Sequence, residues 1–259
     1  MVTICPAKET DFLEEAAHYT FPLTVVRGGV GASTQRNVII RHATDTDLMV
    51  FLDDDYIADP DFLLEVERLF ISQPDIVIAT GDVIADGAQG IGITLDDAKR
   101  MVETLPPQPE EMLQNVFNGY GCNMIVRMSE ARRHGILFDE ALPLYSWWED
   151  VDFSRRLAPF GRIVKSNRLR GVHMGSKSGR SPGQRLGYSQ VANVVYMMQK
   201  GTVPLGVGTL RIARNVFANM TRQFIPEPWV DRRGRFVGNL KAIRDCLYSP
   251  ADPRKCLEL

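Results

Sequence analysis

A three-layer α/β domain is the fold that this sequence predicts, and three observations carry the prediction. Short apolar runs alternate with segments whose apolar residues recur at helical spacing. The run at 48–52 contains five apolar residues in succession, which is typical of a strand buried on both faces. A length of 259 residues allows one large core, and α/β chains of this size often form one domain.

The elements follow in chain order from these patterns. In the first third they are strand 1–7, helix 8–19, strand 22–27, helix 33–43, strand 48–53, helix 60–72 and strand 75–81. Asp59 and Pro60 have the positions of N-cap and first helical residue for the helix at 60–72. Residues 86–109 are rich in glycine and proline and are expected to be irregular. The sheet region is completed by strand 121–127, a helix from 149 and strand 162–168.

Three consecutive acids, Asp53 to Asp55, directly follow the apolar run 48–52. Because side chains alternate across a strand, Asp53 and Asp55 should share one face and Asp54 should lie on the other. Two carboxylates repel each other unless a cation lies between them, and ligands bind at this edge of open α/β sheets. We therefore expect Mn²⁺ or Mg²⁺ carrying a diphosphate here, with a solvated acidic turn as the alternative.

A second acidic cluster, Glu149 and Asp150, opens the helix predicted from 149. Ser146 and Glu149 have the spacing of a capping box, which accounts for Glu149 without chemistry. Asp150 has no such explanation, and a carboxylate facing the first cluster could take a proton from an attacking hydroxyl. Trp147 and Trp148 could stack on a sugar, although core packing is an equal alternative for one of them.

Six motifs, in this order, give the chain a family resemblance. They are Gln-Arg-Asn at 35–37, Phe-Leu-Asp-Asp-Asp at 51–55, Gly-Cys-Asn-Met at 121–124, Phe-Asp-Glu at 138–140, Glu-Asp-Val-Asp at 149–152, and His173. Over roughly residues 1–200 the chain resembles family 2 glycosyltransferases of the GT-A fold, and looks like a bacterial member that builds surface polysaccharide. That resemblance implies a mostly parallel, nucleotide-binding sheet in domain 1–200 and a helical C-terminal extension, 201–259, packed on it.

The resemblance also implies roles for individual residues. Asp55 would be the metal ligand and His173 would reach the metal or the diphosphate, while Asp150, with Glu149 beside it, would be the catalytic base. The implied contacts with the nucleotide sugar are Arg36, Asp53, Asp54, Arg180 and Arg185, and those with the acceptor are Trp147 and Trp148. The implied reaction is inverting transfer from a nucleotide-diphosphate sugar to a hydroxyl of a glycan or lipid-linked acceptor, with Mn²⁺ or Mg²⁺, in bacterial polysaccharide synthesis.

Two segments of the second half are open to more than one interpretation. Residues 171–187 place His173, Arg180 and Arg185 among glycines, as in a lid that folds over a diphosphate or in a plain surface loop. Residues 205–225 are amphipathic and predict a helix. We expect it to pack on the rest of the protein, with a membrane surface as the alternative.

The beginning of the sequence departs from the family pattern. Relatives open with a strand and a helix that carry the first nucleotide contacts, and then reach a second strand with an acidic turn. Here residues 1–7 look like that second strand, and the turn reads Pro-Ala-Lys-Glu at 6–9. We therefore expect Met1 to be internal to a longer protein, and the usual nucleobase contact is not carried over.

Two other functions are alternatives to glycosyl transfer. A sugar-phosphate nucleotidyltransferase also places paired acids beside a nucleotide, but it needs a glycine-rich phosphate loop near its start and has no use for Glu149 and Asp150. A non-catalytic nucleotide-sugar binder would result from loss of the first strand. An in-frame strand encoded upstream of Met1 would favour the enzyme, and a stop codon there would favour the binder.

Charge is unevenly distributed along the chain. Residues 1–150 contain 10 Lys and Arg and 26 Asp and Glu, giving −16, whereas residues 151–259 contain 20 and 6, giving +14. The basic half suits an anionic donor and a lipid-linked acceptor at a membrane, with ion pairing to the acidic half of the chain as the alternative. No nucleic-acid-binding motif accompanies it. Four cysteines without metal-ligand spacing fit a reducing cytosol, so we expect a cytoplasmic protein with a peripheral contact at the inner face of the membrane.

Overall fold

The computed structural model describes residues 2–5, 20–176 and 182–259, and its contacts divide the chain into two compact units. The first consists of Met1–Thr46, Leu137–Asp152 and Ser181–Leu259, and the second of Asp47–Ile136 and Phe153–Arg180. This division differs from the expected domains, 1–200 and 201–259, which stay a prediction. The expected helix 8–19 lies outside the described residues.

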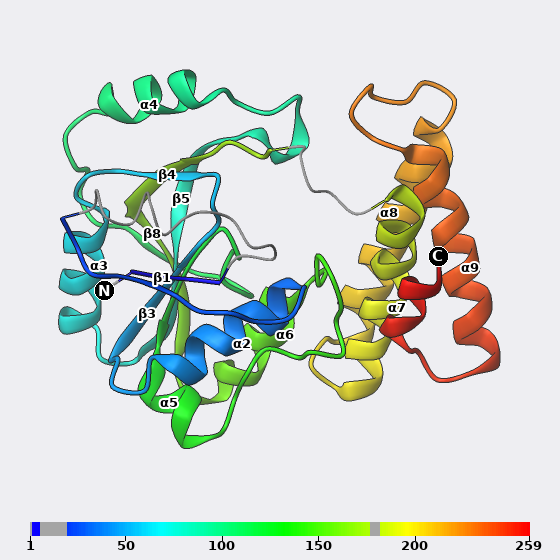
Figure 1. Cartoon of the computed structure of the whole chain (residues 1–259), viewed down its shortest axis with the longest axis horizontal. Helices are drawn as coiled ribbons and strands as arrows, with labels where there is room; N and C mark the ends of the chain where they lie inside the picture. The colour runs from blue at the N-terminus through cyan, green and yellow to red at the C-terminus, as the bar shows by residue number, and fades with distance from the viewer. Residues whose placement is uncertain (1, 6–19, 177–181) are drawn as a thin grey trace. The chain divides into compact units, whose positions relative to one another are not determined.

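The second unit is built on a mixed sheet whose strands follow the order β3-β7-β5-β8-β4, with β6 also paired to β8 (Figure 1). The strands are β3 (Leu48–Leu52), β4 (Tyr56–Ala58), β5 (Ile76–Asp86), β6 (Leu113–Asn115), β7 (Asn123–Arg127) and β8 (Arg162–His173). β5 and β8 are parallel, β7 is antiparallel to β3 and β5, and β4 and β6 are antiparallel to β8. The sheet and its helices confirm the α/β class.

Helix α3 (Phe62–Ser72) covers part of this sheet and forms its main core. Its buried apolar residues recur at helical spacing: Phe62, Val66, Leu69 and Phe70. Burying each such side chain contributes about 1.5–3 kcal/mol. Arg127, at the end of β7, donates to the carbonyls of Phe70 and Gln73 and so satisfies the last turn of α3. The other helices of the unit are η1 (Gly87–Gln89), α4 (Leu95–Glu103), α5 (Met128–Arg133) and η2 (Ala158–Phe160).

The first unit contains a two-stranded parallel sheet and a helical bundle. Strand β1 (Val2–Ile4) pairs with β2 (Leu23–Val25). The helices are α2 (Ala32–His42), the start of α6 (Glu149–Leu157), α7 (Gly183–Lys200), α8 (Leu205–Arg222), α9 (Arg232–Tyr248) and η3 (Pro253–Glu258). α7 and α9 cross so closely that a Cβ atom on Gly187 would lie 2.1 Å from the carbonyl oxygen of Arg235. Across the described ranges, none of the helices combines the length and the apolar character that a membrane span requires.

Several sequence expectations are corrected by the structure. Residues 86–109 are not irregular throughout, because Thr94 caps α4 by accepting the N–H of Asp97. Asp59 is not an N-cap, since α3 begins at Phe62 and Asp59 pairs with Arg170 instead. β3 is not buried on both faces. It is an edge strand of the described sheet, and only alternate residues along it are buried. β5 and β8 continue beyond residues 81 and 168 because they remain paired as far as Asp86 and His173.

Candidate functional site

The acids that follow β3 lie in a tight turn rather than on the strand. β3 ends at Leu52, Asp53 donates its N–H to the carbonyl of Cys122 at 3.2 Å, and Tyr56 donates to the carbonyl of Asp53 at 3.0 Å. β4 then begins at Tyr56. Asp54 is exposed on this turn, whereas Asp53 and Asp55 are half-buried. The expected separation of Asp54 from its two neighbours therefore arises from a turn.

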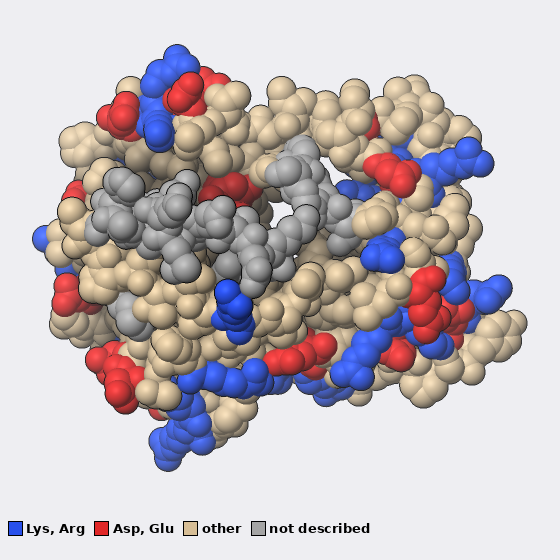
Figure 2. All heavy atoms as spheres, in the orientation of Figure 1, with Lys and Arg blue, Asp and Glu red and all other residues tan. Residues whose placement is uncertain are grey.

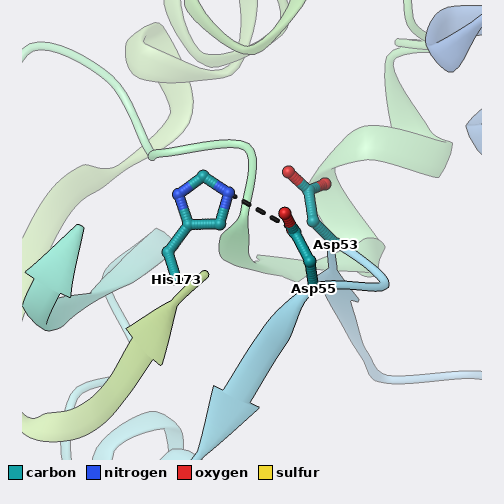
Figure 3. A group of neighbouring side chains, drawn as sticks. All are labelled: Asp53, Asp55 and His173. Carbon is teal, nitrogen blue, oxygen red and sulfur yellow. Dashed lines mark ion pairs between the residues drawn. The ribbon is translucent and has the colours of Figure 1, made fainter. Parts of the chain in front are cut away.

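His173 joins these acids through strand pairing. It is the last residue of β8 and lies opposite Tyr56 of β4, which follows Asp55 directly. Met174 donates its N–H to the carbonyl of Asp55 at 2.9 Å. One ligand atom each from Asp53, Asp55 and His173 lie within 4.8 Å of one another, and Figure 3 shows the three side chains converging. The structure thus brings together three residues that the sequence analysis placed at the nucleotide and metal.

The imidazole of His173 is held between two carboxylates. Its Nε2 atom lies 3.3 Å from Oδ1 of Asp55, and its Nδ1 atom lies 2.9 Å from Oδ1 of Asp86. Burial of the ring opposes protonation, but the two carboxylates outweigh it and raise the pKa of His173 to about 9. A bound cation would have to displace this proton, because only a neutral imidazole can be a metal ligand.

Asp55 is itself stabilised as a carboxylate. Its hydrogen bond with His173 holds its pKa below the usual range against the effect of burial, and Ser176 donates its N–H to Oδ2 at 2.6 Å. Two carboxylates and an imidazole form a donor set that suits Mn²⁺, and carboxylates suit Mg²⁺. The residues present therefore fit a divalent cation.

Asp86 and Tyr120 complete this group and were not predicted. Asp86 binds Nδ1 of His173, which leaves Nε2 directed toward Asp55. Tyr120 donates its hydroxyl to Oδ2 of Asp86 at 3.0 Å, and its ring packs edge-to-face on His173. The available signal for Asp86 was its position after the apolar residues 83–85, which continue the strand beyond its expected end.

Glu149 lies in the first unit and forms an ion pair instead of a cap. Nη1 of Arg36, on α2, lies 2.7 Å from Oε1 of Glu149, and both side chains are nearly buried. The capping box is wrong because α6 begins at Glu149 itself, two residues too late for Ser146 to be the N-cap. The hydroxyl of Ser146 instead donates to the carbonyl of Leu142 and accepts the N–H of Ser33. Arg36 is thus held beside the acidic cluster, and its contact with the nucleotide stays a prediction.

The loop before α6 has an unusual backbone. Leu144, Ser146 and Trp148 have positive φ angles of 58°, 51° and 72°, and no other described non-glycine residue does. Such conformations cost of order 1–3 kcal/mol each and occur most often at functional sites. Asp150 follows this loop, is half-buried and accepts the N–H of Val151 at 2.8 Å. Its role as a base stays a prediction.

The two tryptophans have different surroundings. Trp148 packs against a cluster of buried residues that belong to α6, α7 and the turn after α7: Val151, Val194, Met197 and Val203. Trp147 is half-buried and lies beside the exposed ring of Tyr145, with 6.2 Å between the ring centroids. Trp147 is therefore the better placed of the two to present an indole face to a sugar.

The remaining predicted contacts lie on or before α7. Arg180 falls outside the described residues. Arg185 is on α7 and donates to the carbonyl of Leu259 at 3.3 Å. The lid interpretation is wrong for residues 183–187, because they form the first turns of α7 and their glycines allow close packing on α9. The nucleotide contact of Arg185 stays a prediction.

Comparisons of the sequence and of the structure with known proteins both find similarity to glycosyltransferases. A model of the family described as Glycosyl transferase family 2 matches residues 8–133. The structure resembles the mannosyltransferase PcManGT from Pyrobaculum calidifontis, in complex with GDP-Man and Mn²⁺, with a TM-score of 0.54 and 13% identity over 94% of this chain and 78% of that one. It also resembles S. aureus TarS 1–349, with a TM-score of 0.55 and 13% identity over 98% and 72%. No curated protein matches the sequence. At such identities the structural likeness shows the fold, which is the GT-A fold expected from the sequence.

Proposed function

We propose that this chain, a glycosyltransferase with a family 2 domain and the GT-A fold, transfers a sugar from a nucleotide-diphosphate sugar to an acceptor hydroxyl with inversion. The observation that carries the proposal is the convergence of three side chains. Asp53 and Asp55 lie in the turn after β3, and His173 lies at the end of β8. The GDP-Man and Mn²⁺ of the similar mannosyltransferase support a nucleotide-sugar donor and a divalent cation. The family match disfavours a nucleotidyltransferase, whereas a non-catalytic nucleotide-sugar binder of the same family stays an alternative.

In this proposal the residues of the second unit hold the cation. Asp55, Asp53 and Nε2 of His173 would be its ligands, and Asp86 would keep the imidazole in position through Nδ1. When bound, Mn²⁺ or Mg²⁺ offsets the negative charge of the leaving nucleoside diphosphate. Asp54, Arg36, Arg180 and Arg185 are proposed to contact the nucleotide sugar.

The residues of the first unit act on the acceptor. Asp150 takes the proton from the acceptor hydroxyl as that oxygen attacks the anomeric carbon, opposite the leaving diphosphate. This in-line displacement inverts the anomeric configuration. Glu149, fixed by Arg36, keeps the first turn of α6 in place, and Trp147 and Trp148 are proposed to contact the acceptor. The acceptor is a glycan or a lipid-linked sugar, as in bacterial polysaccharide synthesis.

Removal of Asp55 tests the proposal directly. Asp55→Ala should abolish Mn²⁺-dependent hydrolysis of a nucleotide sugar and weaken Mn²⁺ binding, measured by calorimetry, because a central ligand is lost. Asp54→Ala should have a much smaller effect on Mn²⁺ binding, because Asp54 is exposed and outside the cluster. Unchanged Mn²⁺ affinity in a folded Asp55→Ala protein would contradict the assignment.

A further inference from the structure

Arg211, on α8, lies beside Trp147 and Trp148, which directly precede α6. The guanidinium carbon of Arg211 is 5.5 Å from the ring centroid of Trp147 and 5.3 Å from that of Trp148. Arg214 follows one turn later on the same helix and is exposed. These contacts lie within the first unit, which also contains Asp150.

This cluster has positive charge and hydrogen-bond donors without acceptors. Within the described part of the chain, neither Arg211 nor Arg214 has an ion-pair partner. Three buried nitrogen donors of the neighbourhood also have no hydrogen-bond partner: Nε of Arg211, Nε1 of Trp147 and Nδ2 of Asn215. A buried donor left unpaired destabilises the folded protein, so the surroundings favour a group that brings oxygen atoms.

The terminal nitrogens of Arg211 are the atoms that such a group can reach. They have no hydrogen bond, yet they are not among the buried unpartnered atoms, so they remain accessible to solvent. Burial, and then the nearby charge of Arg214, lower the pKa of Arg211, while the Asp150 carboxylate acts in the opposite direction. The Asp150 carboxylate, the proposed proton acceptor, and the guanidinium groups of Arg211 and Arg214 therefore interact electrostatically.

We propose that Arg211 and Arg214 bind a phosphate ester carried by the acceptor, whose sugar or polyol lies on Tyr145 and Trp147. The inference rests on the proposed function, because it places the acceptor beside Asp150. Guanidinium groups present planar pairs of N–H donors that match phosphate oxygens, and two of them suit a group with several oxygens. Tyr145 is 60% exposed and gives the ring face on which a sugar can lie.

Tryptophan fluorescence offers a binding test that does not depend on turnover. The chain has three tryptophans, and Trp229→Phe leaves Trp147 and Trp148 as the reporters. In this background, glycerol 3-phosphate at constant ionic strength should produce a saturable change, and Arg211→Met and Arg214→Gln should each weaken binding at least tenfold. Arg233→Gln is the matched control, since Arg233 is an exposed arginine of α9 that also lacks a described ion pair. It should bind like the parent.

Two arms distinguish the source of the phosphate. Saturation by glycerol 3-phosphate, but not by glycerol, assigns a soluble phosphate ester. Saturation only by vesicles of phosphatidylglycerol, again lost in Arg211→Met and Arg214→Gln, assigns a lipid-borne phosphate. No saturable change with either probe, or an equal change in the exposed Arg214→Gln and Arg233→Gln variants, overturns the inference. Arg214→Gln keeps the test decisive if Arg211→Met is poorly folded.

A separate measurement distinguishes failure of this site from failure of the proposed function. Mn²⁺-dependent hydrolysis of nucleotide sugars by the unsubstituted chain needs no acceptor. If hydrolysis is absent but phosphate binding is present and lost in the arginine variants, the transferase proposal fails and the anion site stands. If hydrolysis is present and phosphate binding is absent, only the anion site is overturned.

Discussion

Asp86 contributes only indirectly to the candidate metal cluster of Asp53, Asp55 and His173, because its carboxylate contacts the imidazole of His173. Its carboxylate fixes Nδ1 of the imidazole, and Tyr120 and the N–H of Ala88 in turn fix the carboxylate. Burial opposes its ionisation, but these donors and His173 hold the pKa of Asp86 below its usual range. A ligand held in this way loses less entropy when it coordinates a cation.

Asp86→Asn should therefore weaken Mn²⁺ binding by ~10-fold, the lower end of the range for groups that orient a metal ligand. Calorimetric titration with Mn²⁺ measures the effect. Asp82→Asn is the matched control on β5, since Asp82 pairs with Lys165 outside the cluster. Equal affinities for the two variants would mean that Asp86 does not orient His173.

The two acids at the start of α6 should separate catalysis from stability. Asp150→Asn should keep donor binding and lower the transfer rate by ~10²-fold or more, because the amide cannot accept a proton. Glu149→Gln should chiefly lower the melting temperature, because it removes the charge that pairs with the nearly buried Arg36. Measuring donor affinity, transfer rate and melting temperature for both variants shows which acid acts in catalysis and which in stability. Loss of turnover in Glu149→Gln with turnover kept in Asp150→Asn would reverse the two roles.

Motif order pointed to Asp55 and His173, which the structure brings together, but it did not show how they are held. Asp54 differs from its neighbours because of a turn and not because of strand alternation. The place of Asp86 beside His173 depends on a parallel pairing with three register shifts, which a local pattern does not reveal. The ion pair of Glu149 with Arg36 likewise joins positions far apart in the chain. The sequence therefore showed only a local capping pattern at Glu149.

At the scale of elements, local signals predicted most of the helices and strands, and tertiary pairing decided their ends. α2, α3 and α8 lie within a few residues of their expected ranges. α4 was missed although Thr94 and Asp97 have capping spacing, because glycines and prolines surround it. α9 lies in the expected helical extension 201–259, but its range was not predicted, because glycines weaken the helical pattern. One of them, Gly238, packs closely against α7.

The close crossing of α7 and α9 leads to a prediction about Gly187, which lies on α7. Gly187→Ala should destabilise the protein by ~1–3 kcal/mol, because the new Cβ would overlap the backbone of Arg235. Gly206→Ala is the control: nothing lies within 4 Å of its Cβ position on α8, so the change should stabilise by up to ~1 kcal/mol. Chemical denaturation measures both. Equal stabilities would show that the two helices can move apart without loss.

For the molecule as a whole, the basic second half and the surface of α8 support a peripheral membrane contact. The exposed apolar residues of α8 recur at helical spacing and continue into the turn beyond it: Leu210, Phe217, Met220, Phe224 and Ile225. Arg214 and Arg222 border them. Figure 2 shows mostly uncharged surface over the turn between α8 and α9. An apolar surface with adjacent arginines suits the interface of an anionic bilayer.

Sedimentation with vesicles checks this contact. The protein should bind phosphatidylglycerol vesicles more strongly than neutral ones, with binding reduced by salt. Phe224→Ser with Ile225→Ser should weaken binding by ~10-fold or more, because each buried CH₂ contributes about 0.8 kcal/mol. Leu63→Ser, an exposed apolar position on α3, should not change it. Equal binding by both variants would leave charge alone as the cause.

The pairing of Tyr56 with His173 has a consequence for the newly made protein. Asp53 and Asp55 leave the ribosome long before His173, and β4 has no partner among the described strands until β8 has been synthesised. Loop closure over so many residues is an entropic cost that folding meets late, after local helices have formed. A nascent chain ending before β8 should accordingly lack the metal cluster even where its helices are complete, so competence for transfer arises near the end of translation of this unit.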